Sequence, residues 1–161
     1  MFRFAEVSLR LVWIGLGLGA VCWETTPPVV ADEWRITTVA GTGGEADNGR
    51  AGPSRDVNLG QPFGVEIGPD EALYITEVAN HRVWRLDRTS GELKVIAGTG
   101  RKGYSGDGGL ATEADMNEPY EIRFDAGGNL FVVEMRNHIV RRIDAQTGRI
   151  STVAGTGEEG F

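Results

Sequence analysis

The two histidines of the chain are the residues whose type and spacing first suggest chemistry. His81 and His138 each follow an asparagine and are 57 residues apart (138 − 81 = 57). A repeated histidine suggests a shared metal ion, but zinc needs ligand atoms within about 2 Å, whereas packed sheets stand roughly 10 Å apart. We therefore predict no metal here and interpret each Asn-His turn as structural, its side chains bonded to local backbone and to Glu77 or Glu134.

A second candidate is the glycine-rich run around Asp107. A carboxylate is a ligand that calcium accepts, but the run lacks the several evenly spaced carboxylates of a dedicated calcium loop. We interpret the run as a turn in which Asp107 bonds its own backbone, and we expect no cofactor, with calcium as the weaker alternative. Tyr104 and Trp84 are candidate exposed aromatics for a sugar or a peptide, with packing in the core as the alternative.

The remaining patterns do not indicate catalysis. The sequence has no Ser-His-Asp order, no paired-carboxylate motif and no phosphate loop. Its only cysteine, Cys22, falls in the N-terminal segment, so a mature chain has no thiolate nucleophile, disulfide or cysteine metal site. We expect Arg85 with Asp87, and Arg142 with Asp144, to form ion pairs between neighbouring repeats.

A 57-residue repeat positions these residues. The run Val-Ala-Gly-Thr-Gly occurs at residues 39–43, returns with isoleucine first at residues 96–100, and occurs again at residues 153–157. The register holds without a gap, so that Leu73-Tyr74-Ile75 falls on Leu130-Phe131-Val132. Self-similarity at a fixed long period is typical of repeat architectures.

Each repeat contains four short strand-like runs that are closed by turn residues. Several runs are apolar at consecutive positions, which indicates strands buried on both faces of a sheet. The sequence therefore predicts an all-β fold of β-propeller blades, each made of four antiparallel strands. We expect two full blades, at about residues 61–97 and 118–154, and a leading strand from Arg35 to Ala40.

The repeat resembles the NHL repeat, over about residues 34–161. The resemblance rests on Pro62-Phe63-Gly64-Val65, Leu73-Tyr74-Ile75-Thr76-Glu77 and Asn80-His81-Arg82-Val83, and on Asn137-His138-Ile139-Val140 in the second copy. The insert at residues 103–111 is similar to that of extended bacterial-type NHL repeats. The resemblance implies a propeller, usually of six blades, of which this chain forms an incomplete part. It implies no particular reaction.

The chain departs from the family pattern at several points. Glu77 and Glu134 stand where aspartate is usual, Glu121 replaces the glycine of the first copy, and the loop at residues 48–52 lacks the Gly-Asp-Gly-Gly core. Phe161 falls inside the third copy of the loop motif. We interpret the sequence as a fragment or a truncated reading frame.

Charge and the N-terminal segment bear on partners and location. The formal net charge of −7 argues against nucleic acid as a partner. A basic start, an apolar run over residues 11–23 and the small residues of Val29-x-Ala31 predict a signal peptide over residues 1–31. The run is shorter than the about 20 residues of a membrane span. We therefore expect cleavage before Asp32, export to the periplasm or the medium, and no stable membrane insertion. The alternatives are an uncleaved anchor and a lipoprotein attached through Cys22.

The alternating direction of the strands in a blade indicates where the predicted site lies. In a four-stranded meander, the loop between the second and third strands emerges on the same face as the loop that joins one blade to the next, and loops on a rigid scaffold carry function. The expected ligand-binding face contains Tyr104, Asp107, Glu77, Asn80, His81, Glu134, Asn137 and His138.

From this face we predict that residues 32–161 form an exported, non-catalytic binding or scaffold module for a protein, peptide or glycan. One alternative is part of a propeller enzyme, similar to lactonases or amidating lyases, with a divalent metal. Another is a non-functional truncated remnant.

The number of blades also predicts association. Two blades leave an open apolar face at each end, and exposed apolar patches of that size drive association. Because the two faces differ, we expect a head-to-tail contact. The result would be a closed trimer, unless further blades are missing at the C-terminus and the fragment aggregates.

Overall fold

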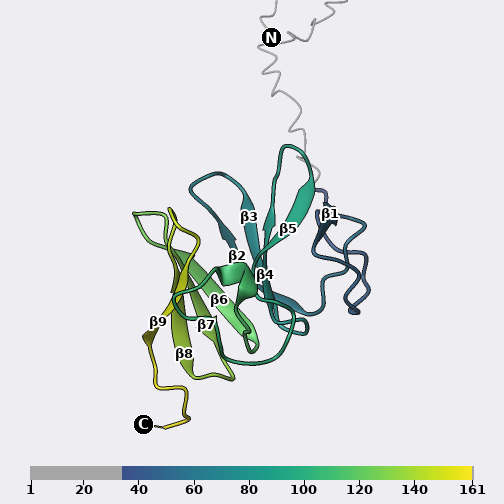
Figure 1. Ribbon diagram of the computed structural model, residues 1–161. Helices are drawn as coiled ribbons and strands as arrows, with labels where there is room; N and C mark the ends of the chain where they lie inside the picture. The colour runs from purple at the N-terminus through teal and green to yellow at the C-terminus, as the bar shows by residue number, and fades with distance from the viewer. Residues whose placement is uncertain (1–33, 161) are drawn as a thin grey trace, which may run out of the picture. The chain divides into compact units, whose positions relative to one another are not determined.

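The computed structural model describes residues 34–160 (Figure 1). The account below concerns the compact unit that contains residues 36–160. The predicted signal peptide, residues 1–31, lies outside the described residues. Among the described residues, no helix has the length and apolar character needed to cross a membrane. The elements, in chain order, are β1 (Ala51–Pro53), β2 (Pro62–Ile67), β3 (Leu73–Glu77), β4 (Arg82–Leu86), β5 (Glu92–Ala97), the 3-10 helix η1 (Ala111–Glu113), β6 (Pro119–Phe124), β7 (Leu130–Glu134), β8 (Ile139–Ile143) and β9 (Ile150–Ala154).

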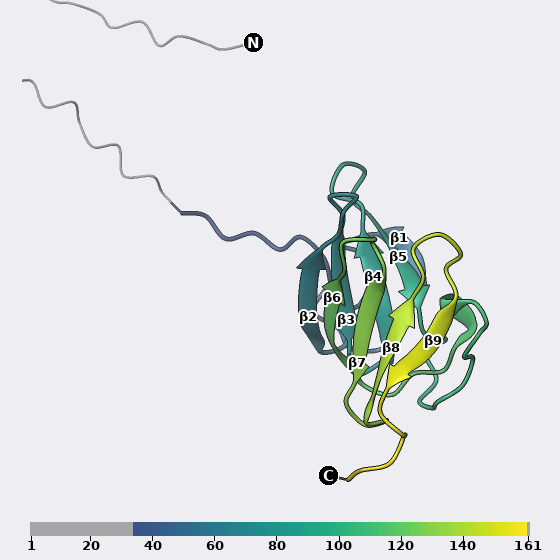
Figure 2. The same cartoon turned by 90° about the vertical axis from the view of Figure 1, so that its left-hand side faces the viewer.

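The strands form two antiparallel sheets that lie side by side (Figures 1 and 2). The first has the order β1-β5-β4-β3-β2, and the second has the order β6-β7-β8-β9. We call strands β2 to β5 blade 1 and strands β6 to β9 blade 2. The blades span residues 62–97 and 119–154, against the predicted 61–97 and 118–154. The predicted all-β architecture of four-stranded antiparallel blades is confirmed.

The repeat extends to backbone conformation. His81 and His138 both lie in the left-handed region at φ 53°, and Gln61 and Glu118 both have φ 52°. In each blade the register shifts near the start of the first strand and again near the start of the third. Corresponding irregularities at the same places in both repeats show that the two blades share one backbone design.

The recurring Ala-Gly step has a steric cause. Gly98 follows β5 at φ 89°, a conformation that L side chains rarely adopt, and a Cβ there would collide with the carbonyl oxygen of His81. Gly155, at φ 89°, has the same relation to the carbonyl of His138. Glycine is therefore required where each outer strand turns into the next linker.

The predicted leading strand from Arg35 to Ala40 is wrong. No strand is assigned there, and the fifth strand of the first sheet is instead β1, which pairs with β5 within the long linker. The physical reason is the missing partner. β5 and β9 are the outer strands of their blades, and each pairs with the preceding strand, β4 or β8. Among the described residues, no strand precedes residues 35–40 in the chain. A strand needs a neighbour to receive its backbone hydrogen bonds.

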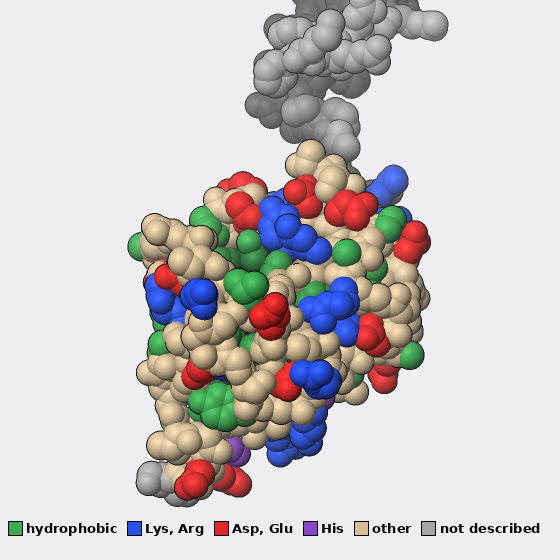
Figure 3. Space-filling model, viewed as in Figure 1, with side chains coloured by type: hydrophobic (Ala, Val, Ile, Leu, Met, Phe, Trp, Pro, Cys, Tyr) green, Lys and Arg blue, Asp and Glu red, His purple; other side chains and the backbone are tan. Residues whose placement is uncertain are grey.

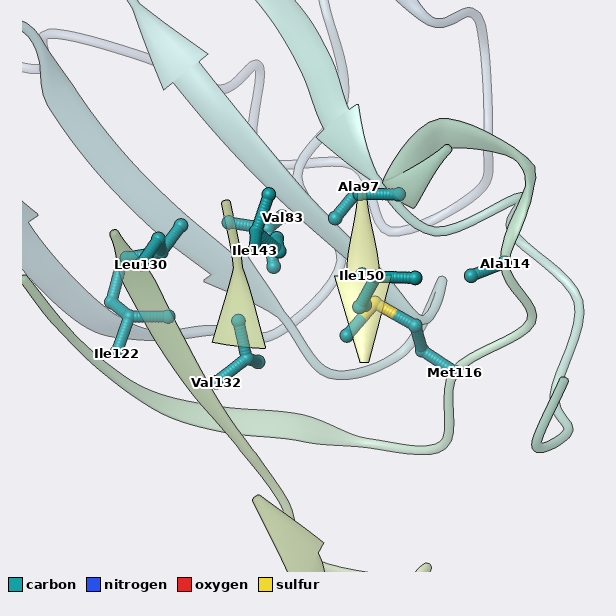
Figure 4. Close-up of a cluster of buried hydrophobic side chains, with 10 residues drawn as sticks. Val83, Ala97, Ala114, Met116, Ile122, Leu130, Val132, Ile143 and Ile150 are labelled. Atoms are coloured by element: carbon teal, nitrogen blue, oxygen red, sulfur yellow. The ribbon is translucent and has the colours of Figure 1, made fainter. Parts of the chain in front are cut away.

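The main core lies between the two blades (Figure 4). Blade 1 contributes Val83 and Ala97, the linker contributes Met116, and blade 2 contributes residues such as Ile122 and Ile150, all at most 1% exposed. Burying one such side chain stabilises the fold by roughly 1.5–3 kcal/mol. A second cluster around Trp84 lies within blade 1 and is packed against by residues of the first linker.

Candidate functional site

The predicted ligand-binding face is formed by the two linkers, residues 41–60 and 98–118, together with the turns between the second and third strands. Asn80 donates from Nδ2 to the carbonyl oxygen of Glu45 at 2.9 Å, and Asn137 donates to that of Gly103 at 2.8 Å. Each turn is thus bonded to the linker that precedes its own blade. The structure brings turns and linkers to one face, which we call the loop face.

Glu77 and Glu134 hold these linkers in place. Glu77 accepts the N–H of Gly60 at 2.7 Å, the amide of Asn80 at 2.6 Å and the indole N–H of Trp84 at 2.7 Å. Both glutamates are 0% exposed. A buried carboxylate with three donors fixes the geometry of everything bonded to it.

Glu134 repeats the arrangement with one different partner. It accepts the N–H of Asn117 at 2.9 Å and the amide of Asn137 at 2.6 Å, and its third donor is the guanidinium of Arg141 at 3.3 Å. Burial raises the pKa of Glu134, and the hydrogen bonds from these three residues partly oppose that rise. The carboxylate is enclosed by its own chain.

The histidines differ from the prediction in detail. The asparagines make the predicted bonds to Glu77 and Glu134, but His81 bonds to neither local backbone nor Glu77. Its Nδ1 instead accepts the N–H of Glu118, at the entry to blade 2, at 3.1 Å. Burial lowers the pKa of the His81 ring. His81 therefore links the turn between β3 and β4 to the end of the second linker, just before β6.

His138 lies at the same turn of blade 2 but in a different environment. It is exposed and has no hydrogen-bond partner among the described residues. The residue that would correspond to Glu118 for this histidine would belong to a further repeat. His138 is thus an exposed polar group of the loop face.

Asp107 does not bond its own backbone as predicted. Its Oδ1 accepts from Arg141 at 2.7 Å, and its Oδ2 accepts the N–H of Thr152 at 3.0 Å. The pKa of Asp107 is lowered because hydrogen bonds from Thr152 and Arg141 outweigh the opposing effect of burial. The glycine-rich run is therefore tied to β8 and β9. Across the described residues, no group of three or more His, Cys, Asp or Glu side chains is placed to hold a metal ion.

Tyr104 is the most accessible aromatic of the loop face. The residue is 48% exposed, the centre of its ring lies 5.5 Å from the guanidinium carbon of Arg141, and its hydroxyl is 2.8 Å from the Thr152 Oγ1. Trp84, the other candidate aromatic, is 0% exposed and packs in the core of blade 1. Tyr104 thus combines an exposed ring with a fixed position.

The predicted ion pairs between repeats are wrong. Arg85 pairs with Asp70 at 2.7 Å and with Asp87 at 3.6 Å, and Arg142 pairs with Asp144 at 2.9 Å, all within one blade. Each pair joins an arginine in the third strand of a blade to an aspartate in a turn of the same blade. Polar contacts between the two repeats come from other residues. The N–H of Glu118 donates to His81, and Arg50 of the first linker donates to the carbonyls of Gly98 and Thr112 in the second linker.

The innermost strands carry stacked aromatics and paired charges. The rings of Phe63 and Tyr120 stack with centroids 3.6 Å apart. Arg123 lies 2.9 Å from Glu121 and 3.4 Å from Glu66. The carboxylates of these strands are thus neutralised across the two blades.

Sequence reasoning missed Arg141. This arginine is fully buried, donates to both Glu134 and Asp107, and holds the loop that carries Tyr104. A signal existed: Arg141 stands where blade 1 has Trp84, and a charged residue replacing a core tryptophan calls for an acidic partner.

On the side of the molecule drawn in Figure 3, acidic and basic side chains are interspersed and apolar side chains lie between them. Such a mixed surface does not select a ligand by charge of one sign.

Comparisons with known proteins agree with the fold. No family model matches the chain. The chain is 31% identical over 102 residues, 63% of its length, to the protein SUPPRESSOR OF QUENCHING 1 of Arabidopsis thaliana, and 33% identical over 98 residues, 53% of its length, to teneurin-1 of Mus musculus. It is 28% identical over 93 residues, 56% of its length, to NHL repeat-containing protein 2 of Homo sapiens. These matches cover 10%, 4% and 12% of the respective relatives.

Two solved structures show the same fold. A protein of unknown function from Bacteroides thetaiotaomicron superposes with a TM-score of 0.55 at 21% identity, over 64% of this chain and 26% of that one. An auxiliary nutrient binding protein from Bacteroides ovatus superposes with a TM-score of 0.50 at 21% identity, over 63% of this chain and 27% of that one.

The 57-residue repeat and the two four-stranded blades agree with these similarities. The chain is similar to NHL repeat-containing protein 2, and its described residues form two four-stranded β-propeller blades.

Proposed function

We propose that the chain is an exported, non-catalytic binding module whose loop face holds a glycan, a peptide or a protein. The observation that carries this proposal is the setting of Tyr104. About half of the residue is exposed, while its contacts with Arg141 and Thr152 fix its position. A preorganised aromatic ring binds sugars and peptides at low entropic cost, because no side chain has to be ordered on binding.

The state of the nearby acidic groups supports a non-catalytic role. Asp107 bonds to Arg141 and Thr152, and Glu134 is fully buried among donors. A general acid or base needs a proton that it can exchange with a substrate. Carboxylates already committed to arginine and backbone donors are better suited to holding loops.

The binding role is tested with the whole chain and two matched variants. Tyr104→Phe keeps the ring and removes the hydroxyl, whereas Tyr104→Ala removes both. We expect a probe selected from a glycan array or a peptide display library to bind the wild type and Tyr104→Phe, and to lose at least tenfold in affinity with Tyr104→Ala, about 1.4 kcal/mol. A probe that binds Tyr104→Ala equally well contradicts the proposed site, and its turnover by the wild type contradicts the non-catalytic role.

Export is tested separately. The basic start, apolar run and Val29-x-Ala31 site motivate it. We expect Edman sequencing of protein isolated from a bacterial periplasm or culture medium to begin at Asp32. Recovery of an intact Met1 from the cytoplasmic fraction would contradict export.

A further inference from the structure

A groove separates the two blades at the ends of the strands that lie opposite the loop face. Three hairpin turns surround it, the turn between β2 and β3 in blade 1 and the turns between β6 and β7 and between β8 and β9 in blade 2. These hairpins form the upper end of the sheets as drawn in Figure 2. We call it the hairpin groove. It is formed between the two described blades and shares no lining residue with the predicted ligand-binding face.

The floor and the walls of the hairpin groove are apolar. Leu130 and Ile143 are 3% and 8% exposed, and Ile96, Tyr74 and Phe124 line the groove as half-buried side chains. The rings of Tyr74 and Phe124 meet edge to face across the two blades, with centroids 4.8 Å apart. The volume of the groove is about 520 Å³. This volume lies within the range of about 300–1,000 Å³ that is usual for small-molecule sites.

A glycine keeps the mouth of the groove open. A Cβ at Gly128 would lie 3.6 Å from the Cβ of Ala145 in blade 2 and 3.7 Å from the Cγ of Pro69 in blade 1. Gly128 therefore stands where the rims of the two blades face each other. Its equivalent in blade 1 is Glu71, which has φ 60° against φ 81° for Gly128. Because this turn accepts a glutamate in blade 1, its backbone alone does not require glycine, and a side chain at Gly128 would project between the two rims.

The polar side chains that line the groove offer hydrogen-bond acceptors to a ligand. Asp70 and Asp144 are the charged residues of the described lining, which contains no lysine, arginine or histidine. The hydroxyl of Tyr74 already donates to Asp70 at 3.2 Å. Arg85 pairs with Asp70 at 2.7 Å and Arg142 pairs with Asp144 at 2.9 Å, but neither arginine lines the groove. The groove therefore presents carboxylates, while the cations that compensate them stay outside its lining.

The backbone of the surrounding turns adds few free donors. The N–H groups of Gly128 and Gly148 donate to carbonyl oxygens of their own turns, at 3.0 and 2.9 Å. Pro69 has no N–H to donate. An anionic ligand needs donors or cations from the protein, and the groove supplies few of them. A cationic ligand instead meets carboxylate oxygens and two aromatic rings, and a cation is attracted to the face of such a ring.

We propose that the hairpin groove is a second binding site, which takes a small organic cation with an apolar body, such as an aryl or alkyl ammonium. The apolar body packs on the floor of the groove. The ammonium group lies against the rings of Tyr74 and Phe124 and near the carboxylates of Asp70 and Asp144. This site is separate from the loop face, so it stands or falls independently of the function proposed for that face.

The first test compares probes of similar size and different charge on the whole chain by isothermal titration calorimetry. We expect benzyltrimethylammonium to bind about tenfold more tightly than neutral benzyl alcohol or anionic benzenesulfonate. Because the net charge is −7, the titrations are made at about 0.15 M salt, which screens general attraction beyond about 8 Å. Tetramethylammonium, a cation without the apolar body, should also bind more weakly. Equal binding of the four probes, or preference for the anion, overturns the proposal.

The second test changes the groove. Phe124→Leu keeps an apolar side chain and removes the aromatic face, and Asp70→Asn removes one carboxylate charge. Each is expected to weaken the binding of benzyltrimethylammonium about tenfold. Glu92→Gln removes an exposed carboxylate at the start of β5, outside the groove lining, and is the matched control. Unchanged binding by both groove variants, or an equal loss with Glu92→Gln, overturns the proposal.

The third test uses the wild type alone, so it does not depend on whether a variant folds. The backbone N–H groups of Gly127, Gly128 and Gly148 belong to the groove lining. We expect their signals in a ¹⁵N–¹H correlation spectrum to shift saturably with benzyltrimethylammonium, with the dissociation constant found by calorimetry. The signals of Gly100 and Gly106 in the second linker should stay in place. Shifts confined to the linker glycines, or no saturable shift at all, overturn the proposed site.

Discussion

Blade 1 and blade 2 hold the same buried glutamate with different third partners. In blade 1 the indole N–H of Trp84 donates to Glu77 at 2.7 Å, and in blade 2 the guanidinium of Arg141 donates to Glu134 at 3.3 Å. Trp84 and Arg141 occupy equivalent positions of the repeat. One neutral and one charged donor therefore fill the same place in one backbone design.

The exchange of tryptophan for arginine also changes how each linker is fastened. In blade 1, Arg82 pairs with Asp47 of the linker at 2.6 Å and lies 5.9 Å from the ring of Trp84. In blade 2, Arg141 pairs with Asp107 at 2.7 Å. Both blades use an arginine, an aspartate and an aromatic ring, but at different positions of the repeat.

This difference shows that the blades conserve a set of contacts rather than a set of positions. Ile139 stands in the place of Arg82, and Tyr104 stands in the place of Asp47. When the arginine moves two residues along β8, the aspartate must move along the linker to meet it. An aspartate on the linker compensates each buried arginine, as burial of charge requires.

The largest expected effect comes from removing the charged donor of blade 2. Arg141→Ala leaves Glu134 buried without its cation and frees the loop at Asp107. We expect the free energy of unfolding to fall by roughly 3–5 kcal/mol, as for breaking a buried pair. Urea denaturation followed by tryptophan fluorescence measures the change.

Arg141→Trp sharpens this result, because it copies the neutral donor of blade 1. The indole N–H can replace one bond to Glu134, so we expect a smaller loss of stability than with Arg141→Ala. An equal loss in both variants would show that the pair with Asp107, rather than the bond to Glu134, dominates.

The neutral donor of blade 1 should cost less to remove. Trp84→Phe keeps an aromatic ring in the core but leaves one oxygen of Glu77 without its indole donor. We expect a loss of about 1–3 kcal/mol in the free energy of unfolding. Tyr74→Phe, which removes a partly exposed hydroxyl bonded to Asp70 at 3.2 Å, is the matched control and should change stability by at most about 0.5 kcal/mol.

The two histidines give a smaller and cleaner comparison, since both have φ 53°. His81→Ala removes the acceptor for the N–H of Glu118 and should cost about 1–2 kcal/mol. His138→Ala removes an exposed ring and should cost at most about 0.5 kcal/mol. Thermal unfolding of both variants measures the difference. Equal losses would mean that the link from His81 to blade 2 contributes nothing, and a metal content that changes in either variant would contradict the structural role.

The smallest effect concerns acid stability. Hydrogen bonding to Arg82 lowers the pKa of Asp47 below its usual 3.8, and the pKa of Asp107 is also lowered. A carboxylate with a lowered folded pKa contributes stability above its unfolded pKa, and that contribution is lost as the pH falls through the folded pKa. Both side chains are more than one-third exposed, so solvent reduces the effect.

We therefore expect Asp47→Asn and Asp107→Asn to lose less stability than the wild type when the pH is lowered from neutral to below 3.8. Denaturant midpoints measured across this range test the expectation. A wild-type slope that neither substitution reduces would show that these two pairs do not contribute to acid stability.

The period, the strand type and the turns could be predicted from the sequence because they depend on local patterns. Consecutive apolar residues in runs such as Leu130-Phe131-Val132 indicate a strand buried on both faces, and Gly98 and Gly155 mark where each outer strand ends. The hydrogen bonds of Asn80 and Asn137 to their glutamates could also be predicted from the sequence, because the partners are only three residues apart.

Only the tertiary structure decided which side chains meet across linkers and blades. The pairing of Arg141 with Asp107 spans 34 residues, and the bond from Glu118 to His81 spans 37, so neither follows from a local pattern. The absence of a strand at residues 36–40 has the same cause. The sequence of this segment is almost that of β9, yet in the described chain it has no counterpart of β8 beside it. A strand forms only where a neighbour in space supplies its hydrogen bonds, and the residues of the segment alone cannot supply them.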